Sequence, residues 1–120
     1  MEAEKRDDPR FPCVHSRECI VDIEDLQKKG FLYNFSRKGL AFHSAHRLSK
    51  NEVHHLEIHA PSFVRPIACD VRIVWAHHDS AKQTCAYGAR ILHMDPALKT
   101  ELLDVFYQDW KRIVIAQSQP

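Results

Sequence analysis

The sequence predicts a mainly β fold, a six-stranded antiparallel β-barrel followed by one C-terminal α-helix. Apolar and polar side chains alternate with a period of two from about residue 13 to about residue 93. Turn-forming residues divide this stretch into six short segments. Beyond Asp95 the apolar residues recur every three or four positions instead. A barrel is favoured because closure leaves no sheet edge unpaired, and a sandwich is the alternative.

The first half of the chain contains three predicted strands. We expect the first over about 14–24, where two apolar side chains alternate with two carboxylates. A second is expected over 30–33, and Leu40 and Phe42 mark the third. These strands are short, which is typical of small barrels.

Three further strands are expected in the second half. The segment 53–60 alternates apolar residues with histidine and glutamate, which indicates a half-buried strand, and Pro61 ends it. Segments 67–76 and 85–92 are interpreted as a hairpin. The polar residues 77–83 are its predicted loop.

The C-terminal segment is predicted to be a helix over about 96–115. Asp95 is a suitable N-cap, and Pro96 suits the first helical position. We expect the apolar stripe of this helix to pack on the barrel or close its open end, although its wider apolar surface leaves room for a homodimer contact. The stripe consists of Leu98, Leu102, Phe106, Trp110 and Ile113.

Composition indicates a single small domain, expected over 13–116 behind an N-terminal arm. The 17 basic residues offset 16 acidic ones, so a binder of nucleic acid polymers is not expected. No apolar run approaches the roughly 20 residues that span a bilayer, and no signal peptide opens the chain. The four cysteines form no CxxC pair and are expected to be reduced. We therefore expect a cytoplasmic protein without membrane insertion.

Residues 1–12 form a polar arm that contains Arg6 and Arg10, spaced as RxxxR. Pro9 fixes its own φ angle and pushes Asp8 toward an extended conformation, so a stiffened extended arm is expected rather than a helix. A guanidinium group pairs with phosphate oxygens or with guanine O6 and N7, and it also stacks on purine rings. The two arginines are therefore candidate contacts for a guanine-bearing anion. The alternative is an ordinary solvated, charge-mixed terminus.

A second candidate group lies at Asn34, Ser36 and Gly39, in the pattern (Asp/Asn)xSxxG. On a strand the first two side chains point the same way and can share one guanine base, while the glycine permits a positive φ or a close backbone approach. Arg37 adds positive charge that is suited to a phosphate contact, as does Lys38. The alternative is a plain β-turn, because these are common turn residues.

Together, the two groups resemble the paired signature of the bacterial PilZ domain, a receptor module for cyclic dimeric GMP (c-di-GMP). The resemblance spans nearly the whole chain and implies a six-stranded barrel with a C-terminal helix. It also implies that Arg6 and Arg10 hold phosphate and guanine, that Asn34 and Ser36 hold a base, and that Gly39 shapes the loop. The segments 71–75 and 87–88 fit the same family, whereas position 34 holds Asn where Asp is commoner.

The function implied by this resemblance is a c-di-GMP receptor or adaptor without another cofactor. Binding would order the arm, change the protein surface and signal to an unidentified protein effector in motility, biofilm or secretion control. The alternative is a PilZ-like interaction module that works without nucleotide. Enzymatic activity is not expected, because the sequence contains no GxSxG, HExxH or Walker motif.

Nine histidines raise a third hypothesis, a metal site that uses His55, Glu57 and His59. Side chains at alternate positions of one strand are about 6.6 Å apart and diverge, whereas a zinc ion needs converging ligands. Solvent-facing histidines without metal are therefore the favoured interpretation.

Overall fold

The computed structural model describes residues 11–12, 19–23, 28–61 and 63–118. Within them the chain forms seven strands and one helix. The elements are β1 (Phe11–Pro12), β2 (Ile20–Ile23), β3 (Lys28–Phe35), β4 (Gly39–Ser44), β5 (Val53–His59), β6 (Ile67–Asp79), β7 (Thr84–Met94) and α1 (Pro96–Ser118).

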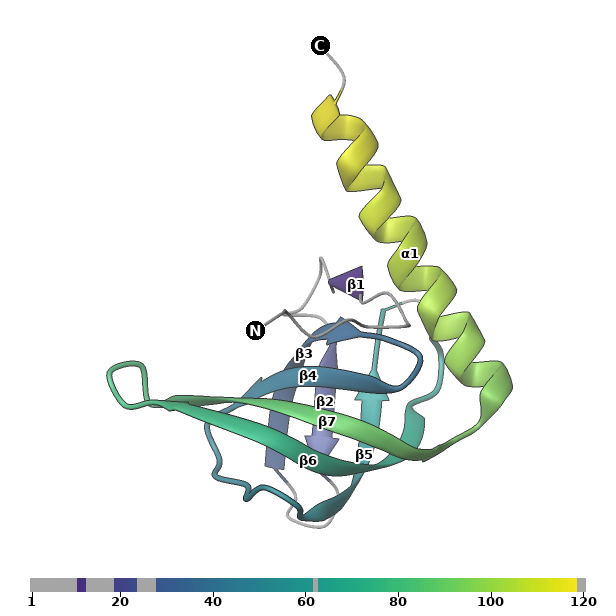
Figure 1. The fold of residues 1–120 in the computed structure, drawn as a ribbon. Coiled ribbons are helices and arrows are strands. Elements are labelled where there is room, and N and C mark those ends of the chain that lie inside the picture. Colours follow the sequence, from purple (N-terminus) through teal and green to yellow (C-terminus); the bar gives the residue numbers. More distant parts are fainter. Residues whose placement is uncertain (1–10, 13–18, 24–27, 62, 119–120) are drawn as a thin grey trace, which may run out of the picture.

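Six of the strands form the predicted closed antiparallel barrel (Figure 1). The sheet runs β3-β2-β5-β6-β7-β4, and β4 pairs with β3 to complete the ring. The short strand β1 is an addition to the predicted set, and it pairs with the last two residues of β3. The two edge strands of the sheet, β3 and β4, are therefore joined, and the barrel formed by the described strands has no open edge. This is the closure that the alternating pattern predicted.

The interior of the barrel is filled by the alternate apolar side chains of each strand. In β2, Val21 and Ile23 are fully buried, and in β5 the same is true of Leu56 and Ile58. His54 shares the inward face of β5 and is also buried, so the expectation of solvent-facing histidines was wrong for this residue. Its ring nitrogen lies 3.0 Å from a carboxylate oxygen of Glu52, which offsets part of the cost of burying a polar ring.

The β6–β7 hairpin is longer than predicted. Both strands continue through the polar segment, so His77 and His78 lie in β6 and only residues 80–83 form the loop. In Figure 1 this hairpin projects beyond the body of the barrel. Extended strands with solvent on both faces lack an apolar face, so their polar sequence resembles a loop.

Helix α1 begins where predicted. The carboxylate of Asp95 accepts hydrogen bonds from the backbone N–H groups of Ala97, at 2.9 Å, and Leu98, at 3.4 Å, which confirms the predicted N-cap. In the first half of the helix, Leu102 and Phe106 are buried against the barrel. This part of the helix therefore contributes to the core.

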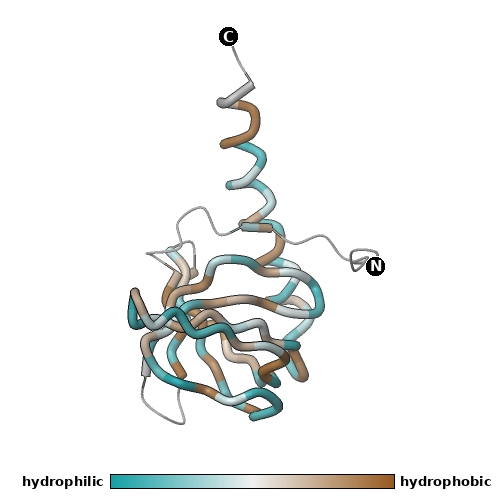
Figure 2. Tube along the Cα trace, turned by 60° about the vertical axis from the view of Figure 1, so that its left-hand side comes forward, coloured by the Kyte–Doolittle hydropathy of each residue, from teal (hydrophilic) through white to brown (hydrophobic). Residues whose placement is uncertain are grey.

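The second half of the helix extends away from the barrel (Figures 1 and 2). Trp110 is 37% exposed and Ile113 is 42% exposed, so the expectation that the whole stripe packs on the barrel was wrong for these two residues. Val114 and Ile115 are also exposed, and this part of the helix is hydrophobic in Figure 2. Within the described residues, no helix is long and apolar enough to cross a bilayer.

The cysteines in the described part of the chain form no disulfide. Cys19, Cys69 and Cys85 are buried thiols, and Cys13 lies outside the described residues. Burial raises the pKa of Cys69 to about 12, because the thiolate would lose its hydration in the barrel interior. We therefore assign these three side chains to packing.

Candidate functional site

The Asn34–Gly39 segment lies at the junction of β3 and β4. Ser36 closes the connection between the two strands: its backbone N–H donates to the Gly39 carbonyl at 2.8 Å. Its hydroxyl donates to the same carbonyl at 3.1 Å and accepts from the Gly39 N–H at 3.2 Å. Ser36 is only 4% exposed. The hydroxyl thus stabilises the turn.

Gly39 is required here for a close backbone approach and not for a positive φ. All glycines of the described residues have ordinary φ values. A Cβ atom at position 39 would lie 2.6 Å from the carbonyl oxygen of Ala89 in the neighbouring strand β7. The Lys38 carbonyl, one residue earlier, accepts a hydrogen bond from the Ile91 N–H at 2.8 Å. The turn is therefore held directly against β7.

Asn34 differs from Ser36 in its bonding. It lies in β3, opposite Pro12 of β1, and its side chain is half-buried. The Oδ1 atom is shielded from solvent and has no hydrogen-bond partner among the described residues. A shielded amide oxygen without a donor is unfavourable, so an added N–H donor would stabilise it.

The end of the arm lies next to this segment. Phe11 pairs with Phe35 and Pro12 pairs with Asn34 in an antiparallel ladder. The arm therefore joins the barrel beside the β3–β4 turn. Arg6 and Arg10 themselves lie outside the described residues, so their predicted ligand contacts stay predictions.

A cavity of about 330 Å³ opens beside the turn, between β1 and the helix. Arg37 contributes the positive charge to its wall and is exposed, as the sequence suggested. The other lining residues were not predicted, because the helix brings most of them in from far along the chain. They are Phe11, Thr100, Leu103, Asp104 and Tyr107.

Aromatic rings gather at the edge of this cavity. The ring centroids of Phe11 and Tyr107 are 5.5 Å apart in an edge-to-face arrangement, and Trp110 lies 6.2 Å from Phe11. Aromatic faces beside a guanidinium group can bind a planar base by stacking while the cation contacts phosphate. The one sequence signal for this cluster is that Phe11 directly follows the RxxxR string.

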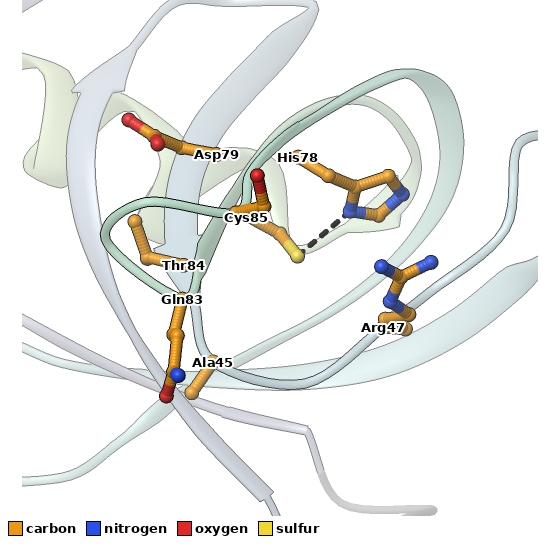
Figure 3. A pocket seen from close by; sticks show the side chains of 8 residues that line it. Ala45, Arg47, His78, Asp79, Gln83, Thr84 and Cys85 are labelled. Carbon is orange, nitrogen blue, oxygen red and sulfur yellow. Dashed lines mark hydrogen bonds between the residues drawn. The ribbon is translucent and has the colours of Figure 1, made fainter.

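A second cavity, of about 260 Å³, lies beside the loop end of the β6–β7 hairpin (Figure 3). There the Nδ1 atom of His78 lies 2.8 Å from the sulfur of Cys85, and Arg47 faces the same space. None of the predicted ligand residues lines this cavity. The first cavity is therefore the better candidate for the predicted site.

The three residues of the metal hypothesis do not all meet in the structure. The Nδ1 atom of His55 lies 2.7 Å from a carboxylate oxygen of Asp70 in β6, whereas Glu57 and His59 meet Asp22 of β2. His55 is therefore not part of the cluster that contains the other two residues. The sequence could not reveal this because the pairing of β2 with β5 joins distant segments.

Comparison with known proteins decides the family. The family model described as PilZ domain matches residues 4–108 of the chain. The chain belongs to the PilZ domain family. The match includes both the RxxxR string and the Asn34–Gly39 segment, so the resemblance drawn from these motifs is confirmed at the level of the family. Among curated proteins, no match to the chain was found.

Solved structures share the fold at low sequence identity. The Bacillus subtilis inhibitor of motility MotI/DgrA is 19% identical, with a TM-score of 0.70 over 88% of this chain and 51% of that protein. The PilZ domain of Escherichia coli YcgR with c-di-GMP is 13% identical, with a TM-score of 0.68 over 96% of this chain and 98% of that domain.

A YcgR structure in complex with c-di-GMP, also from Escherichia coli, gives a TM-score of 0.71 at 13% identity, covering 96% of this chain and 50% of that one. The PilZ chain thus spans about half the length of this protein and of MotI/DgrA. These likenesses confirm the barrel fold.

Proposed function

We propose that this PilZ domain is a c-di-GMP receptor that signals to a protein partner. The observation that carries the proposal is the pairing of Phe11 with Phe35, which joins the arginine-bearing arm to the barrel beside Asn34 and Ser36. Family membership and the two YcgR structures with c-di-GMP give further support. This pairing supports the assignment of both halves of the motif to one site, although they are separated in sequence.

Each predicted contact has a distinct chemical role. Arg6 and Arg10 supply guanidinium groups for the two phosphates and for a guanine edge or face. The Oδ1 of Asn34, which has no hydrogen-bond partner among the described residues, accepts an N–H group of guanine. Ser36 keeps the turn in shape through Gly39, and ligand binding can exchange these weak neutral bonds for a bond to the base.

Arg37 adds a positive charge to a cavity wall that also contains Asp104. Its guanidinium group lines the cavity beside the turn and is suited to contact a phosphate oxygen. Binding draws the arm against the turn and covers the aromatic rings at the edge of the cavity. The changed surface lies next to α1, whose exposed second half offers an apolar face to an effector protein.

Isothermal titration calorimetry tests the proposal. The full chain is titrated with c-di-GMP, with GTP and with cyclic di-AMP under the same conditions. Saturable binding of c-di-GMP is expected, with much weaker binding of the other two, because GTP lacks the second guanine and cyclic di-AMP lacks the N1–H and O6 groups of guanine. Absence of c-di-GMP binding would reject the receptor function.

Ser36→Ala is expected to weaken c-di-GMP binding by about 1–3 kcal/mol, through loss of a buried hydroxyl beside the base. Ser44→Ala is the matched control, because the Ser44 hydroxyl is equally buried and donates to the Lys29 carbonyl at 2.9 Å away from the arm. The control should lose stability without losing affinity. Equal affinities in both variants, measured by calorimetry, would remove Ser36 from the site.

A second candidate function is a protein interaction module that works without nucleotide. The exposed apolar half of α1 favours it, because Trp110, Ile113, Val114 and Ile115 are 37–45% exposed on one projecting element. Partner binding that is unchanged by c-di-GMP and is lost in Ile113→Asp would support this function.

A further inference from the structure

Three side chains of metal-binding type meet on the outer face of the barrel, where β2 and β5 pair. Asp22 lies directly opposite Glu57, and His59 lies two residues further along β5. One ligand atom from each of the three lies within 4.8 Å of the others. This cluster lies on β2 and β5 and includes no residue of β1 or of the β3–β4 turn, where the dinucleotide site is proposed.

The two carboxylates of the cluster have one basic neighbour on β3, the exposed Lys29, which lies opposite Asp22. Two carboxylates directly opposite each other on a sheet repel. The Nε2 atom of His59 is shielded from solvent and has no hydrogen-bond partner among the described residues. It lies 3.6 Å from a carboxylate oxygen of Asp22, which is too long for a hydrogen bond. A cation between these atoms would relieve the repulsion and satisfy the imidazole at the same time.

We propose that Asp22, Glu57 and His59 form a binding site for a divalent transition-metal ion such as Zn²⁺. One imidazole nitrogen and two carboxylate oxygens suit a borderline metal better than Mg²⁺ or Ca²⁺, which prefer oxygen ligands alone. The three side chains are half-buried, so water completes the coordination. The ion would join β2 to β5 and stabilise the barrel, because the unfolded chain does not bring these ligands together.

A second histidine on strand β5 provides a control for this site. His55 projects from the same face of β5 as His59, but its Nδ1 lies 2.7 Å from Asp70 on the other neighbouring strand, β6. If the metal ion bound to partly exposed histidines without selectivity, its affinity would depend on both His55 and His59. A metal held by the cluster depends on His59 alone.

Zn²⁺ titration of the full chain, without a polyhistidine tag and without dinucleotide, tests this site. Calorimetry is expected to show one saturable ion per chain, and Zn²⁺ is expected to raise the melting temperature because it binds the folded state. His59→Gln and Asp22→Asn should each lower the affinity at least about tenfold and remove the thermal shift. His55→Gln should change neither quantity.

Circular dichroism establishes whether each variant is folded. If His59→Gln or Asp22→Asn does not fold, Glu57→Gln is used in its place to test the cluster. Failure of the wild-type chain to bind Zn²⁺ would overturn the proposal. Undiminished affinity in His59→Gln, or equal losses in His59→Gln and His55→Gln, would also overturn it. Loss of c-di-GMP binding leaves these outcomes unaffected, so the two proposals succeed or fail separately.

Discussion

Arg10→Ala is expected to lower the affinity for c-di-GMP by at least about 3 kcal/mol, roughly a hundredfold, while the barrel stays folded. Arg10 directly precedes Phe11, whose pairing with Phe35 fixes the point where the arm meets the β3–β4 turn. In the proposed role, the Arg10 guanidinium group would supply two charge-assisted hydrogen bonds to phosphate or guanine, and alanine would supply none.

Two further variants make this result specific. Arg10→Lys keeps the charge but loses the planar fork, so its affinity should lie between those of the wild type and Arg10→Ala. Arg47→Ala removes the same kind of side chain from the second cavity and should leave the affinity unchanged. Calorimetry in which Arg10→Ala binds as tightly as Arg47→Ala would reject the role of the arm.

Phe106→Ala is expected to lower the free energy of unfolding by about 3–5 kcal/mol, the usual range for removing a buried phenyl group. Phe106 is 2% exposed, and its ring lies edge-to-face against Phe35 at 5.9 Å. The ring thus fastens the helix to the strand that leads into the turn. Urea denaturation measures the loss.

Ile113→Ala is the matched control on the same helix. Ile113 is 42% exposed on the projecting half, so its truncation should change the free energy of unfolding by no more than about 0.5 kcal/mol. Similar losses in the two variants would contradict the arrangement in which only the first half of α1 belongs to the core.

Much of the fold could be predicted from the sequence, because each strand carries its own signal. The alternation around Val21 and Leu56 identified inward faces that are fully buried in the structure. Asp95 before Pro96 marked the start of the helix at the correct residue. These are local patterns, and they depend little on the rest of the chain.

The errors arose where burial depends on distant parts of the chain. The apolar spacing of Trp110 and Ile113 resembles that of Leu102, but the barrel ends before it reaches the second half of the helix. The polar sequence around His77 and His78 predicts a loop, whereas both residues lie in strand β6. The strand is polar there because the hairpin projects from the barrel and needs no apolar face. Local periodicity contains no information about where a neighbouring element ends.

The candidate site was predictable in its parts but not in its geometry. The motifs at Arg6 and Asn34 indicated the family, which the family match confirms. The sequence could not show that the Ser36 hydroxyl bonds to Gly39, or that the helix brings Tyr107 to the cavity beside Arg37. Both facts depend on how β1, the turn and α1 pack together.

The central claim is that c-di-GMP binds where the arm meets the β3–β4 turn. Mapping backbone amide chemical shifts by NMR during titration with c-di-GMP tests it most directly. We expect the largest changes in residues 6–12 and 34–39, with smaller ones around Tyr107. Changes confined to the second cavity around Arg47 and Cys85, with the arm and turn unaffected, would contradict the claim.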